Sequence, residues 1–186
     1  MSSDYENYMK FLQGDKDSLA PIVSAYNDKL VLFLFSYVKS MSTAEDLAAD
    51  TFLYLLIKKP AFKEVAAFKT WLFRVAANKA IDYLRKSKRF PEISLEDANL
   101  EMDIYYHNAE QTIIRNEETA KMYAALSSLS ADYQTVLQLL YFEEMSYKQI
   151  AKVMKKTEKQ IKNLAYNARN AAKTALQKEG FSYEIK

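Results

Sequence analysis

Hydrophobic positions recur every three or four residues along most of this chain, which is the spacing of an amphipathic α-helix. The pattern predicts helices at 5–13, 19–40 and 43–59, the first stopped by Gly14 and the third by Pro60. Ser42 and Glu45 have the spacing of a capping box at the start of the third helix. The expected core of the second helix consists of Ile22, Val23, Tyr26, Leu30, Phe33, Leu34 and Tyr37.

The stretch 146–169 predicts two short helices joined by a tight turn. Ser146 and Thr157 are each followed three residues later by a glutamine, and both pairs are capping boxes that start a helix. The first helix should therefore end by Met154, which leaves the lysines at 155–156 as the turn. The second helix is expected to bury Ile161, Leu164, Ala165 and Ala168 against Ile150, Ala151 and Met154.

The opposite face of that second helix is cationic and able to form hydrogen bonds. Asparagine pairs with adenine edges, lysine reaches guanine acceptors or phosphates, and one helix fits the major groove of DNA. An exposed helix face can also be polar without binding anything, but Met145 to Lys178 carry a local charge of +8, which favours a DNA-binding surface. The residues of this face are Lys159, Lys162, Asn163, Tyr166, Asn167 and Asn170.

A second basic block runs from Lys58 to Arg89 and also carries +8, although the whole chain is only +2. Two separated positive surfaces indicate two contacts on one polyanion. A helix starting near Phe68 should bury Phe68, Leu72, Val75, Ala76, Ala80, Tyr83 and Leu84. Its polar stripe is Arg74, Asn78, Asp82 and Arg85. The aromatic residues near its start, Phe62, Phe68, Trp71 and Phe73, either stack on unpaired bases or belong to the core.

The composition indicates an all-α protein and excludes several kinds of chemistry. With 186 residues, two glycines and three prolines, the chain suits two small helical domains. It has no cysteine, a single histidine (His107) and no glycine-rich phosphate loop, so we expect no enzyme activity, no catalytic residue, no metal and no cofactor. The polar N-terminus is no signal peptide, and the apolar run 30–38 is too short to insert into a membrane, so a cytoplasmic protein is expected.

The predicted domains are residues 1–90 and 119–179, joined by an acidic linker at 91–118 and followed by a tail at 180–186. Residues 91–118 carry eight acidic side chains and one basic side chain, and their hydrophobic positions show weak periodicity. In the second domain Ser130 should cap a helix that continues through residue 142. Its inward side chains are expected to be Val136, Leu137, Leu140 and Tyr141.

Two blocks of the sequence resemble a known family. AEDLAADTF followed by FKTWLFRVAANKAIDYLRK is similar to the conserved region two of sigma-70 family factors of the extracytoplasmic-function (ECF) group. LSSLSADYQTVLQLLYFEEMSYKQIAKVMKK, with the later Ala168 and Arg169, resembles region four of the same group. The two blocks occur in the family's order and cover about residues 21–89 and 125–176. They depart from the family at Ala49, Lys155, Lys156, Leu164 and Asn167, so promoter preference does not transfer.

The resemblance implies three sets of site residues. Contact with the clamp helices of the largest subunit of core RNA polymerase is implied for Glu45, Asp46, Leu47 and Asp50. Recognition and melting of the promoter −10 element is implied for Trp71, Arg74, Asn78, Asp82, Arg85 and Lys86, with the loop before Phe68 as a pocket for a flipped base. Recognition of the −35 element is implied for Thr157, Lys159, Lys162, Asn163, Tyr166, Asn167 and Arg169.

The expected function is therefore that of a transcription initiation factor, which directs core RNA polymerase to promoter DNA and assists its melting. The resemblance also implies an anti-sigma factor as a partner. The alternative is a helix-turn-helix regulator that acts on duplex DNA without being a polymerase subunit, and such proteins usually dimerise. The second basic block, at 58–89, and AEDLAADTF distinguish the two, because a repressor needs neither.

Overall fold

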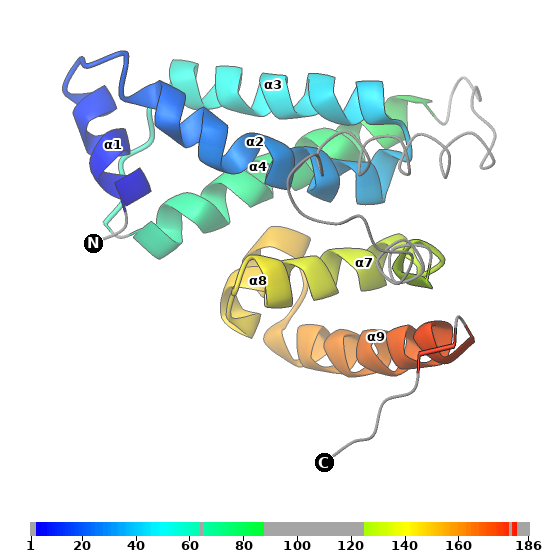
Figure 1. Cartoon of the computed structure of the whole chain (residues 1–186). Helices are drawn as coiled ribbons and strands as arrows, with labels where there is room; N and C mark the ends of the chain where they lie inside the picture. Colours follow the sequence, from blue (N-terminus) through cyan, green and yellow to red (C-terminus); the bar gives the residue numbers. More distant parts are fainter. Residues whose placement is uncertain (1–2, 64, 88–124, 179, 182–186) are drawn as a thin grey trace. The chain divides into compact units, whose positions relative to one another are not determined.

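The computed structural model describes residues 3–63, 65–87, 125–178 and 180–181, and these form two compact helical units (Figure 1). The N-terminal unit contains α1 (Ser3–Leu12), α2 (Leu19–Val38), α3 (Met41–Lys58) and α4 (Val65–Ser87). The C-terminal unit contains α7 (Ala131–Leu137), the π-helix η1 (Gln138–Phe142), α8 (Tyr147–Met154) and α9 (Glu158–Lys178). The all-α prediction is confirmed. The predicted linker at 91–118 lies outside the described residues.

Helix α2 is the centre of the N-terminal unit, because it packs against α1, α3 and α4. Five of its seven predicted core residues are buried, whereas Val23 and Tyr37 are half-buried. Val31 and Phe35 are buried instead, because a helix with three neighbours buries more than one face. Within the described residues, α2 alone is long and apolar enough to cross a membrane, but 44% of that window is buried inside the protein, as in a core helix.

Helix α3 begins earlier than its predicted capping box. Ser40 has extended backbone angles (φ −134°, ψ 127°), and its side-chain oxygen accepts a hydrogen bond from the Thr43 amide at 3.5 Å. Ser42 lies inside the helix, so the predicted box of Ser42 and Glu45 is wrong. The predicted stop is confirmed, since Lys59 adopts a left-handed conformation directly before Pro60. Helix α4 begins at Val65, which makes the basic loop before it shorter than the sequence suggested.

In the C-terminal unit, α7 packs against α9 and continues into the π-helix η1. The Glu143 amide donates to the Gln138 carbonyl, five residues back, at 3.1 Å. This wider turn changes which side chains face the core. Leu139 is fully buried, while Tyr141, predicted to face inward, is 58% exposed.

Candidate nucleic-acid interface

Helices α8 and α9 form the predicted helix-turn-helix, and both predicted caps are present. The Ser146 amide donates to Gln149 Oε1 at 2.8 Å, and the Gln149 amide donates back to Ser146 Oγ at 3.3 Å. The corresponding distances for Thr157 and Gln160 are 2.7 Å and 3.2 Å. Each pair satisfies two amides that the first turn of a helix leaves unbonded, which fixes where both helices begin.

The turn between them is held by Lys155 and Lys156. Lys155 is left-handed (φ 53°, ψ 42°), so the turn forms without glycine. The Lys156 amide donates to the Ala151 carbonyl at 3.1 Å, and its Nζ lies 3.2 Å from a carboxylate oxygen of Asp132 on α7. The turn is therefore tied both to α8 and to the supporting helix.

Helix α9 presents the predicted polar face to solvent. Ile161, Ala165 and Ala168 are buried and Leu164 is half-buried, as the hydrophobic spacing predicts. The predicted −35 residues are all exposed and lie between the cap of α9 and the middle of the helix: Thr157, Lys159, Lys162, Asn163, Tyr166, Asn167 and Arg169. Within the part of the chain that the structure describes, nothing hydrogen-bonds to the side chains of Asn163, Tyr166 or Asn167. Their polar atoms are available to a ligand.

Two of the cations on this face contact tyrosines that were not predicted as site residues, although Tyr141 was predicted as a core residue. Lys162 Nζ lies 3.4 Å from Glu158 and 6.0 Å from the ring centre of Tyr147. The Arg169 guanidinium donates to the hydroxyl oxygens of Tyr141 and Tyr147, and these hydrogen bonds raise the pKa of Arg169. The outward position of Tyr141 follows from the π-helix, which the spacing of hydrophobic residues does not reveal.

A chain of aromatic rings runs through the start of the second basic block, in the N-terminal unit. Trp71 is half-buried and stacks on Tyr54 of α3, with ring centres 5.9 Å apart. Phe62, in the loop before α4, packs edge-on against Trp71 at 5.7 Å and against Phe68 at 5.5 Å. Phe68 and Phe73 are fully buried, so the core interpretation is correct for these two. Phe62 and Trp71 remain partly accessible.

Lysines surround the accessible end of this aromatic chain. The Nζ atoms of Lys58 and Lys79 lie 5.8 Å and 5.9 Å from the ring centre of Tyr54, which is 38% exposed. A partly exposed ring flanked by cations is the combination with which proteins hold unpaired bases and their phosphates. Tyr54 was not among the predicted site residues, because its sequence position is that of an ordinary helix residue.

The predicted −10 residues form one stripe along α4, since they recur at helical spacing from Trp71 to Lys86. Arg74, Asp82, Arg85 and Lys86 are exposed, and Arg85 lies 3.4 Å from Asp82. Asn78 is half-buried. Its side-chain oxygen is buried without a hydrogen-bond donor among the described residues. The stripe therefore contains an acceptor without a donor. A buried oxygen of this kind lowers the stability of the folded protein by about 1–3 kcal/mol.

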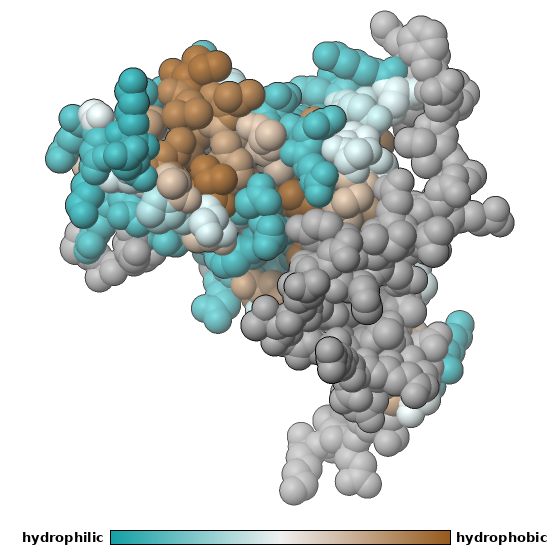
Figure 2. All heavy atoms as spheres, turned by 45° about the horizontal axis from the view of Figure 1, so that its top comes forward, coloured by the Kyte–Doolittle hydropathy of each residue, from teal (hydrophilic) through white to brown (hydrophobic). Residues whose placement is uncertain are grey.

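The predicted polymerase-binding residues lie on α3. Glu45 and Asp46 are exposed, Leu47 is half-buried, and the exposed Asp50 forms an ion pair of 3.4 Å with Lys79 of α4. Hydrophobic side chains also gather on the surface of the N-terminal unit (Figure 2). The large exposed apolar residues of α3 are Leu53, Tyr54 and Ile57.

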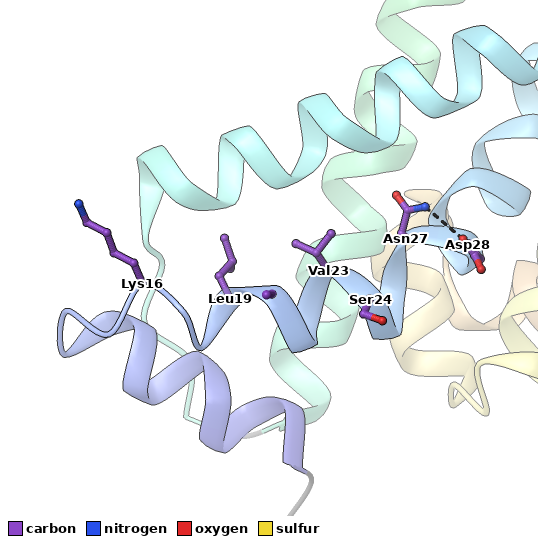
Figure 3. A pocket seen from close by; sticks show the side chains of 7 residues that line it. Lys16, Leu19, Val23, Ser24, Asn27 and Asp28 are labelled. Atoms are coloured by element: carbon purple, nitrogen blue, oxygen red, sulfur yellow. Dashed lines mark hydrogen bonds between the residues drawn. The ribbon is translucent and has the colours of Figure 1, made fainter.

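A surface hollow lies along the first half of α2 (Figure 3). It is open, measures about 740 Å³ and runs along the start of α2, where Asn27 donates to Asp28 at 3.1 Å. Among the described residues, no three His, Cys, Asp or Glu side chains are grouped to hold a metal ion. The hollow is lined by Lys16, Leu19, Ala20, Val23, Ser24, Asn27 and Asp28.

Comparison with known proteins matches both units to one family. Residues 22–90 match the family model "Sigma-70 region 2", and residues 119–171 match "Sigma-70, region 4". The ECF RNA polymerase sigma factor SigM of Bacillus subtilis is 31% identical over 164 residues, which span 88% of this chain and 97% of SigM. The chain belongs to the sigma-70 family, in its ECF group. As a sigma factor it acts in transcription initiation.

Further similarities agree with this family. The RNA polymerase sigma-H factor of Pseudomonas aeruginosa is 29% identical to this sigma factor over 172 residues and 89% of each chain. The solved structure of CnrH in complex with the cytosolic domain of CnrY shares the fold, with a TM-score of 0.63 over 95% of this chain and 98% of that one, at 20% identity. RpoE from Bartonella quintana, solved with the anti-sigma factor NepR, gives a TM-score of 0.62 over 86% and 96% of the two chains, at 21% identity.

Proposed function

We propose that this sigma factor binds core RNA polymerase through α3, recognises and melts the −10 element with α4 and the loop before it, and reads the −35 element with α9. The corresponding domains are residues 1–90 and 119–179, joined by a linker at 91–118 and followed by a tail at 180–186. The protein acts in the cytoplasm as a non-catalytic factor that needs no metal or cofactor. An anti-sigma factor is its expected regulator.

The observation that carries the proposal is the exposed face of α9. Asn163, Tyr166 and Asn167 point their polar atoms to solvent on a helix whose start and packing are fixed by a capping box and a buried apolar face. Asparagine in this position can read adenine edges in the major groove, while Lys159 neutralises phosphates.

A second observation supports the role of the N-terminal unit. The rings of Tyr54, Phe62 and Trp71 form a partly exposed series beside Lys58 and Lys79. Base stacking on such rings contributes about 1–3 kcal/mol per base, and it requires unpaired bases. A duplex reader at α9 and a single-strand site at α4 together suit a protein that recognises one promoter element as duplex and opens another.

Run-off transcription with purified core RNA polymerase tests the proposal directly. The template is a pool of upstream genomic fragments from the source organism, with and without the protein. We expect discrete transcripts that require the protein, and their start points would reveal the promoter elements. If the protein instead binds duplex DNA and leaves polymerase unbound, it is a helix-turn-helix regulator and the proposal is wrong.

A further inference from the structure

Helix α1 makes an unusual set of contacts with the loop of residues 59–63, which connects α3 to α4. The Tyr5 hydroxyl donates to the carbonyl of Phe62 at 2.8 Å, and the Tyr8 hydroxyl donates to the carbonyl of Pro60 at 2.7 Å. The loop thus receives two hydrogen bonds from a helix more than 50 positions earlier in the sequence. Loop carbonyls have no regular partner, so these bonds determine the path of the backbone.

The rings of α1 reinforce the same contact. Tyr8 is fully buried, and its ring lies 5.5 Å from Phe62 and 5.0 Å from Phe68. Burial raises the pKa of Tyr8 to about 12, so its hydroxyl remains a hydrogen-bond donor throughout the physiological range. Lys59, at the start of the loop, places its Nζ 5.2 Å from the ring centre of Phe11. Both ends of α1 therefore contact the loop or the residues that support it.

The contact continues from the loop to the proposed −10 surface. Phe62 packs against both Tyr8 and Trp71, and Trp71 stacks on Tyr54. A change in the position of α1 would move Phe62, and Phe62 cannot move without changing the environment of Trp71. The match to the family model begins at residue 22, so α1 precedes the part of the chain that this model describes.

We propose that α1 is a positioning element for −10 recognition: Tyr5 and Tyr8 hold the loop 59–63 in the conformation that an unpaired promoter base meets. The inference rests on the proposed role of that loop in the sigma factor. It assigns α1 an effect on base preference at the −10 element, and none on binding of core polymerase or of the −35 duplex. Tyr5 and Tyr8 act through the loop and do not themselves touch DNA.

The test uses variants that remove only the hydroxyl groups. Tyr5→Phe, Tyr8→Phe and the double variant keep the rings and lose the hydrogen bonds to the loop. Tyr133→Phe is the matched control, because it removes a hydroxyl from a half-buried tyrosine on α7, outside the N-terminal unit. Each protein is assembled with core polymerase and titrated with labelled single strands of the −10 element from a promoter found by run-off transcription, in which each base is replaced in turn.

We measure base preference as the dissociation constant for a replacement base divided by that for the preferred base. We expect this ratio to fall about tenfold in the double variant, which corresponds to the net contribution of two hydrogen bonds. The ratio should be unchanged in Tyr133→Phe. Trp71 is the only tryptophan of the chain, so its emission in the free protein should shift to longer wavelength in the double variant as the loop loosens. Tyr5→Phe alone, at a half-buried position, gives the same readouts if the double variant folds poorly.

The outcomes separate this inference from the proposed function. An equal loss of affinity for every single strand, with the ratios preserved, would show that α1 only stabilises the unit, and would overturn the inference. Ratios that fall equally in Tyr133→Phe would overturn it as well. If the wild-type holoenzyme shows no base preference at the −10 strand, the proposed function of the loop is wrong, and the inference falls with it.

Discussion

At the scale of single residues, left-handed lysines replace the glycine that usually ends a helix. Lys39, Lys59 and Lys155 follow α2, α3 and α8 with φ of 56°, 43° and 53°. A side chain in this conformation costs roughly 1 kcal/mol. A lysine cation at a helix C-terminus interacts favourably with the helix dipole, which offsets part of this cost. The cations of Lys39 and Lys59 also lie over the rings of Phe35 and Phe11.

Replacing Lys155 by glycine should stabilise the C-terminal unit. Lys155→Gly removes the strained Cβ from the turn, and we expect the free energy of unfolding to rise by up to about 1 kcal/mol. Urea denaturation followed by circular dichroism measures it. The control is Lys152→Gly, inside α8, which should lower stability by about 1 kcal/mol. A loss of stability in Lys155→Gly would mean that its cation outweighs the backbone strain.

Asn163 and Lys159 should differ in the kind of DNA binding that they support. Asn163→Ala should relax base preference at one or two positions of the −35 element, at a cost of about 1–3 kcal/mol there. Lys159→Ala should weaken all duplexes by a similar factor, because a phosphate contact carries no sequence information. Competition binding with a library of duplexes measures both. A uniform loss from Asn163→Ala would contradict the proposed docking of α9.

At the scale of helices and turns, the sequence predicted the features that depend only on neighbouring residues, such as helix caps. Ser146 and Thr157 have no other serine or threonine nearby that could act as the cap. The structure confirms both capping boxes. Ser40 and Ser42 both lie near the start of α3, and spacing alone could not decide which of them is the cap. The exposure of Tyr141 depends on a π-helix, and the ring chain around Trp71 depends on contacts between helices. Neither feature leaves a pattern in the sequence, whereas the exposed face of α9 does.

The acidic residues in the second turn of α3 provide a prediction at this scale. Asp46→Lys should weaken binding of core polymerase by at least about tenfold, because a like charge opposed to a basic partner surface costs several kcal/mol. Binding of the −35 duplex should be unaffected. Asp28→Lys, on the exposed side of α2, is the control with the same change in net charge. Co-elution with core polymerase in size-exclusion chromatography measures the effect. Equal losses in both variants would rule out a specific site on α3.

At the scale of the whole molecule, charge is concentrated in two basic blocks while the total is only +2. The blocks belong to different units, and each carries a surface with its own proposed DNA element. The residues outside the two blocks have a strongly negative net charge, so the net positive charge of the protein is confined to the two basic blocks. This arrangement favours binding at two places along one DNA molecule over diffuse attraction across the protein.

The dependence of promoter binding on salt should reveal both contacts. Each duplex phosphate contact contributes a slope of about −0.9 to log K against log salt, and each single-strand contact about −0.7. Lys159→Ala and Lys86→Ala should each remove one such contribution from the holoenzyme, and the double variant should remove their sum. Filter binding across a salt series measures the slopes. A double variant no different from either single variant would show that the two surfaces do not engage one promoter together.

The place of Trp71 in the aromatic chain has a practical consequence. The sequence contains one tryptophan and no cysteine, so a single cysteine placed at the exposed Thr174 of α9 could carry the only acceptor dye. Energy transfer from the indole would then report the separation of the two units in solution. Repeating the measurement as promoter DNA is added would show whether the separation of the two units changes.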